Sequence, residues 1–261
     1  MLSKLLKNDL RKNMRWLWIL FAATIVCACL ARTFSELGDN IAFFRVFGIF
    51  FYSVYYALAA NVIIQSFLRN FLNFQKSLYS DESYLTHTLP VTKNQIVNSK
   101  FLTALIEMVA SFAVLVISLV IMFASPEFKD VLTMLISTIV VGEFSLGLAI
   151  TLIVILILVE FLMYLSIIYF SIVVAYKLKE RRAFKAFLIT MAMAFAALIA
   201  LAVVLVVVLV VNDVKLSASS LVLSNAAFVS VLVSGIVMYL AVSVLFYFLT
   251  KRELNKGVNV D

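Results

Sequence analysis

Acidic side chains inside long apolar stretches are the first candidates for chemistry in this sequence. Glu107, Glu143 and Glu160 each lie within such a stretch. A charged group at the middle of a bilayer costs about 2.5–3.5 kcal/mol on insertion scales, so it normally faces the interior of a helix bundle. Glu160 is the deepest of the three, and Tyr164 follows one helical turn later, where it can donate a hydrogen bond. We expect Glu160 to line an internal or subunit-facing surface and to be protonated at neutral pH.

Polar residues also recur at helical spacing in these stretches. One row, at intervals of four, four and seven residues, contains Thr103, Glu107, Ser111 and Ser118. A second row contains Ser53, Asn61 and Gln65. Such rows either join helices by hydrogen bonds within lipid or line a transport path, and the sequence favours neither interpretation. The candidate residues for a helix interface or a transport path are therefore Ser53, Asn61, Gln65, Glu107, Ser111, Glu160 and Tyr164.

Groups that could support catalysis or bind a metal are scarce. The sequence has one histidine, His87, and two cysteines, Cys27 and Cys29, which is too few for a metal cluster. Its six glycines never cluster, and it has no G-x-x-x-x-G-K-[ST] phosphate loop. We expect no catalytic, metal-binding or cofactor-binding residue on this chain, and we expect the chain not to be an enzyme.

The elements that position these residues must be membrane helices. The 261 residues are 65% hydrophobic and only 13% charged, whereas soluble domains average about 45–50% apolar and about 25% charged residues. Several apolar runs exceed the about 20 residues that a spanning helix needs, and they lack the alternation of barrel strands. The sequence therefore predicts an all-α polytopic membrane protein with a single transmembrane domain over residues 1–261.

We expect six spans and one interfacial helix. Residues 1–15 combine apolar positions at helical spacing with five basic residues, which is typical of an amphipathic helix lying in the membrane interface. The apolar segment 128–143 is short, and we interpret it as an outer-face interfacial or re-entrant helix or as an extension of the fourth span. The six spans are expected at about residues 16–34, 43–68, 101–124, 144–176, 186–211 and 221–250.

The distribution of basic residues predicts the orientation. With the N-terminus in the cytoplasm, 17 of the 21 Lys and Arg residues fall on the cytoplasmic side of this layout. Because cytoplasmic loops carry an excess of basic residues, both termini are expected inside, in a multi-pass protein of the cell (plasma) membrane. The net charge of +7 thus reports orientation, and we expect no nucleic-acid partner.

The longest polar interruption, residues 69–100, is predicted to be a cytoplasmic loop between the second and third spans. Thr92 and Gln95 have the spacing of a capping box, so a helix should begin near Lys93 and run unbroken into the third span. Upstream, a short helix over residues 70–79 is expected, with an exposed apolar edge formed by Phe71, Phe74, Leu78 and Tyr79. Exposed aromatic residues beside acids suit a protein interface.

The stretch SLYSDESYLTHTLPVTKNQIVNSK within this loop resembles the loop between spans 2 and 3 of ABC-2-type transporter permeases, and it is most similar to that of small Firmicute permeases. Ser83 replaces the glycine that is usual in the family pattern. The matching residues are Asp81, Glu82, Tyr84, Leu85, Leu89, Pro90, Gln95 and Lys100.

The resemblance implies that the loop contains a coupling helix that docks on a separate ATP-binding subunit. ATP and Mg would then be bound by that partner, and a second permease copy or a paralogue would complete the exporter. The family's substrates include antimicrobial and toxin peptides, drugs and lipids, and an amphipathic peptide is our first expectation. A non-transporting immunity or sensor protein and an ion-coupled secondary transporter using Glu160 are the alternatives. The expected ATPase contacts are Phe74, Leu78, Tyr79, Asp81, Glu82, Ser83, Tyr84 and Leu85.

Overall fold

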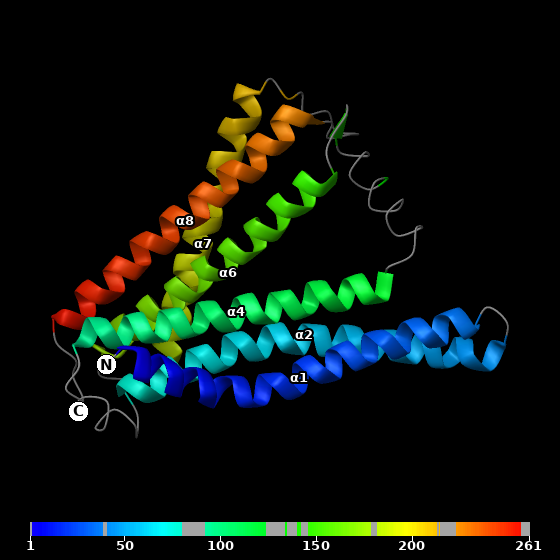
Figure 1. The fold of residues 1–261 in the computed structure, drawn as a ribbon. Helices are drawn as coiled ribbons and strands as arrows, with labels where there is room; N and C mark the ends of the chain where they lie inside the picture. The colour runs from blue at the N-terminus through cyan, green and yellow to red at the C-terminus, as the bar shows by residue number, and fades with distance from the viewer. Residues whose placement is uncertain are drawn as a thin grey trace. The chain divides into compact units, whose positions relative to one another are not determined.

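The computed structural model describes residues 2–38, 41–79, 92–123, 134, 140–141, 146–178, 182–212, 214 and 223–256. Apart from two strands of two residues each, the elements in these ranges are helices (Figure 1). They are α1 (Leu2–Gly38), α2 (Ala42–Tyr79), α4 (Lys93–Phe123), β1 (Val140–Val141), α6 (Leu146–Ala175), α7 (Arg182–Val211), β2 (Leu223–Ser224) and α8 (Asn225–Asn255). The six helices are all long and apolar enough to cross a membrane. The predicted all-α polytopic fold with six spans is therefore confirmed.

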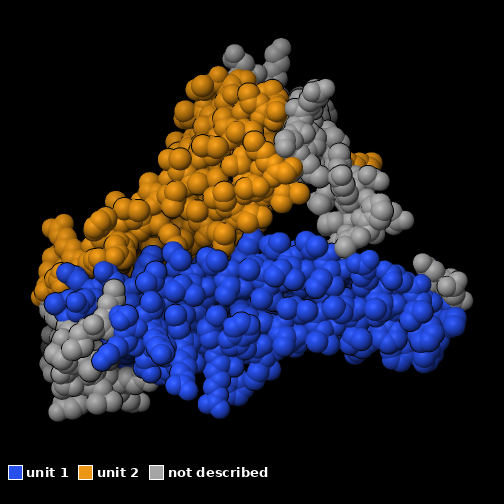
Figure 2. All heavy atoms as spheres, viewed as in Figure 1, with its two compact units in different colours: residues 1–128 blue, residues 129–261 orange. Residues whose placement is uncertain are grey.

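The chain divides into two compact units, residues 1–128 and residues 129–261, which Figure 2 distinguishes by colour. Unit 1 contains α1, α2 and α4, and unit 2 contains α6, α7, α8 and the strand pair.

Unit 1 is built around α1, which packs against both α2 and α4. Leu17 and Phe21 of α1 are buried together with Val62 of α2 and Leu115 of α4. The turn between α1 and α2 needs a glycine at position 38, because a Cβ built there would lie 2.9 Å from the Cα of Arg45. The absence of a side chain at Gly38 therefore lets α1 and α2 approach closely at this end.

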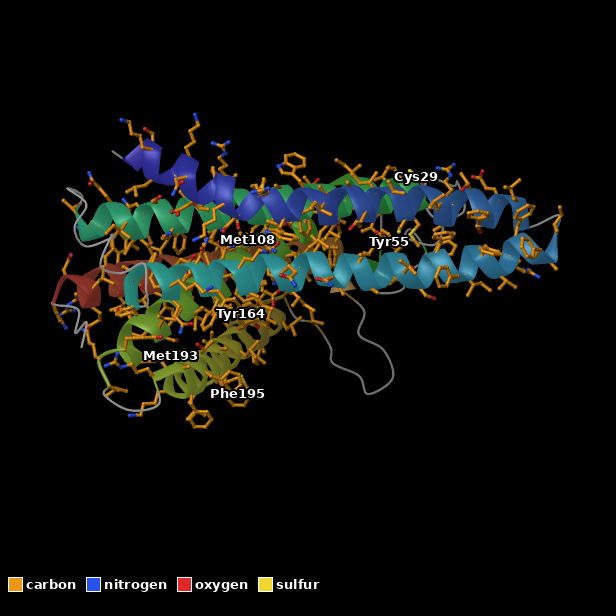
Figure 3. The ribbon with its side chains drawn as sticks, turned by 90° about the horizontal axis from the view of Figure 1, so that it is seen from below. Cys29, Tyr55, Met108, Tyr164, Met193 and Phe195 are labelled. Atoms are coloured by element: carbon orange, nitrogen blue, oxygen red, sulfur yellow. The ribbon has the colours of Figure 1, made fainter. Side chains whose placement is uncertain are left out.

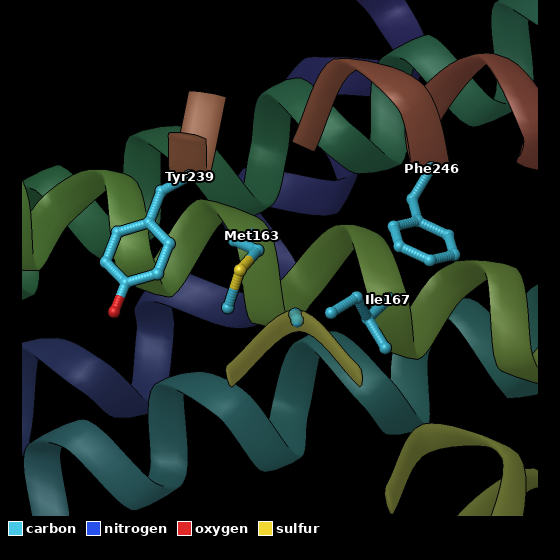
Figure 4. Packing of buried hydrophobic residues seen from close by; sticks show 5 residues of the cluster. Met163, Ile167, Tyr239 and Phe246 are labelled. Atoms are coloured by element: carbon cyan, nitrogen blue, oxygen red, sulfur yellow. The ribbon is translucent and has the colours of Figure 1, made fainter. Parts of the chain in front are cut away.

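Unit 2 is organised around α6, which packs against α7 and α8. Met163 and Ile167 of α6 form a buried cluster with Tyr239 and Phe246 of α8, joined by Ala197 of α7 (Figure 4). Most of α7 is exposed in the structure, and Phe195 points away from the neighbouring helices (Figure 3). An apolar helix with so little buried surface is suited to contact lipid.

Two helices are longer than the sequence suggested. Residues 2–38 form one helix, so the basic N-terminal segment continues directly into the first span instead of forming a separate element. Helix α2 continues to Tyr79, so the prediction of a separate short helix over residues 70–79 is wrong. The physical reason is that this stretch contains neither Gly nor Pro, and its inner face stays packed inside unit 1.

The segment 128–143 lies mostly outside the described residues. Its described part includes β1, in which Val140 pairs in parallel with Leu223 and Val141 pairs with Ser224. Ser224 also caps α8, since its hydroxyl accepts a hydrogen bond of 3.2 Å from the backbone N–H of Ala227. The start of α8 is thus fixed to this segment within unit 2.

Candidate functional site

The start of α4 shows the capping box that the sequence predicts. The backbone N–H of Gln95 donates to the Thr92 hydroxyl at 3.3 Å, and the Thr92 N–H donates to the Gln95 side-chain oxygen at 3.1 Å. Helix α4 begins at Lys93 and continues without a break to Phe123. The predicted helix start is confirmed, and residues 80–91 form the connection between two long helices.

The expected ATPase contacts divide into two groups. Five of them, Asp81, Glu82, Ser83, Tyr84 and Leu85, lie outside the described residues. The expectation that Phe74 and Leu78 are exposed is wrong, because both are fully buried, with 0% exposed surface. They continue the inner face of α2 into unit 1, and Tyr79, the last residue of α2, is half-buried. A partner docking beside residues 80–91 would therefore meet neither Phe74 nor Leu78 in this conformation.

An ion pair lies inside unit 1 at the start of α4. The Lys100 ammonium group is 2.8 Å from the Asp9 carboxylate of α1, and only 10% and 12% of their side-chain surfaces are exposed. Ser99 donates a second, longer hydrogen bond of 3.5 Å to the same carboxylate. This pair joins α1 to the helix that follows residues 80–91.

Further polar side chains continue from this pair into the bundle. Asn73 of α2 donates a hydrogen bond to the Asn13 side chain of α1, which is 4% exposed. Asn70, which is 2% exposed, donates to the backbone oxygen of Ser66 at 2.8 Å. Together with the ion pair, these residues form what we call the polar junction: Asp9, Asn13, Asn70, Asn73, Lys100, Thr103 and Glu107.

Glu107 is the most buried member of the polar junction, with 0% exposed surface. Asn13 and Asn70 lie beside its carboxyl group, and Arg69 and Asp9 act on it electrostatically. Within the described residues, neither Glu107 oxygen has a partner at full hydrogen-bond geometry, and the Thr103 hydroxyl one turn earlier also has none. Buried polar groups of this kind cost about 1–3 kcal/mol each when left unpaired, so the packing around Glu107 must offset this cost.

The rest of the α4 polar row also faces the interior of unit 1. The Ser111 hydroxyl is 2.7 Å from that of Ser66, and the Ser118 hydroxyl is 3.1 Å from that of Tyr55 (Figure 3 shows Tyr55 on α2). These hydrogen bonds link α4 to α2. For this row, the observed packing is that of a helix interface.

The polar row expected on α2 does not lie on the face that packs into the interior of unit 1. Ser53 and Asn61 are exposed and Gln65 is half-buried. The side chains that α2 contributes to the interior are instead Tyr55, Val62, Ser66, Asn70 and Phe74. Sequence reasoning missed this face because its polar members alternate with apolar ones. The spacing of four from Val62 through Ser66 and Asn70 to Phe74 was the available signal.

The candidate glutamate on α6, Glu160, lies near aromatic side chains. Glu160 is half-buried on α6, and both Tyr164 of α6 and Tyr239 of α8 lie within electrostatic range of it. In the described part of the chain, no hydrogen bond joins Glu160 to Tyr164, so the expected bond is not formed. Six residues after Glu160 on α6, the Ser166 hydroxyl lies 3.3 Å from that of Ser243. Sequence reasoning missed Tyr239, which comes from a distant helix.

The α1 members of the polar junction were missed as well. Asp9 and Asn13 precede Leu17 and Phe21 at intervals of four, so all four lie on one face of α1. The prediction for residues 1–15 rested on the basic residues, which lie on the opposite face of α1. A continuous apolar face that ends in two polar residues indicates where a helix interface leaves the hydrocarbon region.

The arrangement offers an ion pair and hydrogen bonds between neighbouring helices. Within the described ranges, no group of three or more His, Cys, Asp or Glu side chains could hold a metal ion. Comparisons with protein-family models, curated proteins and solved structures find no match.

Proposed function

We propose that this chain is the membrane-spanning permease subunit of an ATP-driven exporter of the ABC-2 type. It would reside in the cell membrane with both termini in the cytoplasm, and a second permease copy or paralogue and an ATP-binding subunit would complete the transporter. Six apolar helices, the resemblance around residues 80–91 and the bias of basic residues support this proposal.

One structural observation carries the proposal: the segment with the family resemblance connects two unbroken helices. Helix α2 has 38 residues and α4 has 31 residues. At about 1.5 Å per residue, α2 is about 57 Å long, whereas the hydrocarbon core needs about 30 Å. A movement of residues 80–91 would therefore be transmitted directly to two spanning helices.

The polar junction would extend this movement to a third helix. Because Lys100 is paired with Asp9, α1 is fixed near the start of α4. The contacts of Asn13 with Asn73 tie α1 to α2 at the same level. The three helices of unit 1 would thus respond together when residues 80–91 move.

In the mechanism that we propose, ATP binding closes the two partner ATPases, and residues 80–91 transmit the closure to α2 and α4. The paired permeases then open outward. The exposed surfaces of the spans are strongly apolar, and an amphipathic antimicrobial or toxin peptide is the substrate class that suits them. ATP and Mg would act on the partner chain only.

The test is co-purification of the full-length protein with a chain that hydrolyses ATP. Deleting residues 70–85 would be a poor variant, because Asn70, Phe74 and Leu78 belong to the packed interior of unit 1. Charge reversal by Asp81→Lys with Glu82→Lys is more selective. We expect it to abolish association with the ATPase while the protein still inserts.

The matched control is Lys76→Glu, an exposed α2 position close to the segment. It should leave ATPase association intact. Retained association in the Asp81/Glu82 variant would refute coupling through this segment. A protein that acts without any ATPase would fit an immunity or sensor role, and dependence on a proton gradient without ATP would fit a secondary transporter that uses Glu160.

A further inference from the structure

The outer face of α1 near its N-terminus is rich in basic residues. Its basic residues are all exposed: Lys4, Lys7, Arg11, Lys12 and Arg15. Asp9 is the only acidic residue among the first 35 residues of the sequence. Its carboxylate is turned into unit 1, where it is 8% exposed and paired with Lys100 at 2.8 Å. The one acid among the first 35 residues is therefore turned away from this face.

Part of this face is hollowed. A cavity of about 390 Å³ is lined by Asn8, Arg11, Lys12, Arg15 and Trp16. These positions recur at intervals of three and four, so they share one side of α1. The guanidinium carbon of Arg69, from α2, lies 6.0 Å from the centre of the Trp16 ring at the end of this row. Two helices thus contribute positive charge to one small region.

The tryptophans locate this hollow at the height of the lipid headgroups. Trp16 and Trp18 are 61% and 62% exposed, and the apolar stretch of α1 begins at this point. Exposed tryptophans at the end of a spanning stretch concentrate at the membrane–water interface. The basic side chains that precede Trp16 therefore reach the layer that contains lipid phosphates.

We propose that this hollow is a binding site for the phosphate headgroup of an anionic phospholipid. Arg11 and Arg15 offer planar pairs of N–H donors that match phosphate oxygens, and Asn8 offers an amide donor beside them. Trp16 would pack against the glycerol region of the same lipid. A zwitterionic lipid carries its own cation, which these basic side chains would repel, so the site selects lipids with a net negative charge.

The two tryptophans of the sequence make a direct assay possible. In the Trp18→Phe protein, Trp16 is the only indole and reports on the hollow. The full-length protein is reconstituted in phosphatidylcholine vesicles that contain a small fraction of brominated phosphatidylglycerol, which quenches a nearby indole. The same measurement with brominated phosphatidylcholine gives the reference. We expect Trp16 to be quenched preferentially by the anionic lipid.

In this background, Arg11→Gln with Arg15→Gln should lower the preference for the anionic lipid by about tenfold or more, since each substitution removes charge-assisted hydrogen bonds to the phosphate. The matched control, Lys4→Gln with Lys7→Gln, removes the same charge from the same helix outside the hollow. It should change the preference by less than about threefold. Arg11→Lys with Arg15→Lys should keep a part of the preference, and circular dichroism verifies that each variant remains helical.

Equal losses in the two Gln variants would overturn the proposal, because a diffuse field of net charge would then explain the binding. Displacement of the brominated lipid by millimolar inorganic phosphate would also overturn it, since the site would then bind free phosphate. Retained preference in the Arg11/Arg15 variant would show that these residues do not form the site. The assay needs no ATPase and no substrate, so its outcome is independent of the proposed transport function.

Discussion

The Lys100 ammonium group lies 2.8 Å from the Asp9 carboxylate, although the two residues are 91 positions apart in the sequence. This pair connects the first helix of the chain to the helix that follows residues 80–91. Among the described residues of unit 1, it is the ion pair with the least exposure to water. Both charges were visible in the sequence, but only the fold brings them together.

We expect removal of one partner of this pair to be strongly destabilising. Asp9→Leu or Lys100→Met should each cost about 3 kcal/mol, because each leaves an uncompensated charge in a nearly buried position. The double variant Asp9→Leu with Lys100→Met should recover much of this loss, since it removes both charges and fills the volume. Thermal unfolding of the purified protein, arranged as a double-mutant cycle, measures the coupling. Additive losses in the double variant would contradict the prediction.

The capping box at the start of α4 gives a second prediction. Thr92→Ala should destabilise the first turn of α4 by about 1 kcal/mol, because the hydroxyl that accepts from the Gln95 N–H is lost. Hydrogen exchange of the backbone amides of residues 93–96 should then accelerate about fivefold. Thr92→Ser keeps an accepting hydroxyl and serves as the control. Unchanged exchange in the alanine variant would mean that the helix start is held by other contacts.

The number and type of the elements could be predicted because lipid imposes strict requirements on sequence. Long apolar runs with few charges can only be spanning helices, and each of the six expected spans corresponds to one long helix. The helix ends were less predictable. Polar residues at 70–79 suggested a loop, but α2 continues there, since Phe74 and Leu78 still have an interior to pack into. Hydropathy cannot distinguish a loop from a helix that projects beyond the membrane.

The candidate site was predictable only in part. The row from Thr103 to Ser118 was recognised from its spacing, because its four polar residues all lie on one face. Asp9, Asn13 and Tyr239 were missed, since their significance depends on which distant helix packs against them. A single sequence records the faces of its helices but not the pairing between those faces.

The hydrogen bond between Tyr55 and Ser118 should contribute modestly to stability. Tyr55→Phe and Ser118→Ala should each cost about 0.6 kcal/mol, the average for side-chain hydrogen bonds between membrane helices. The double variant should cost little more than either single one. Chemical unfolding in mixed micelles can resolve such differences. A loss above about 2 kcal/mol in Tyr55→Phe would show that this hydroxyl has a larger role than joining α2 to α4.

Glu160 provides the last prediction, which depends on the proposed transport function. The residue lies near the middle of α6 (Leu146–Ala175), at about 21 Å from either end, and it is only half-buried. A carboxyl group at this depth needs a polar or protein surface beside it, so its exposed side should face a partner copy or the transport path. Glu160→Gln keeps the size of the side chain but removes its ability to carry charge. Since a hydrogen bond of a neutral side chain contributes about 0.5–1.5 kcal/mol, we expect export or pairing of permeases to fall by up to about tenfold. Peptide export by reconstituted vesicles and the oligomeric state in detergent measure the two effects, with Tyr164→Phe as a control that keeps the carboxyl group. If Glu160→Gln changes neither export nor assembly, Glu160 has no such role.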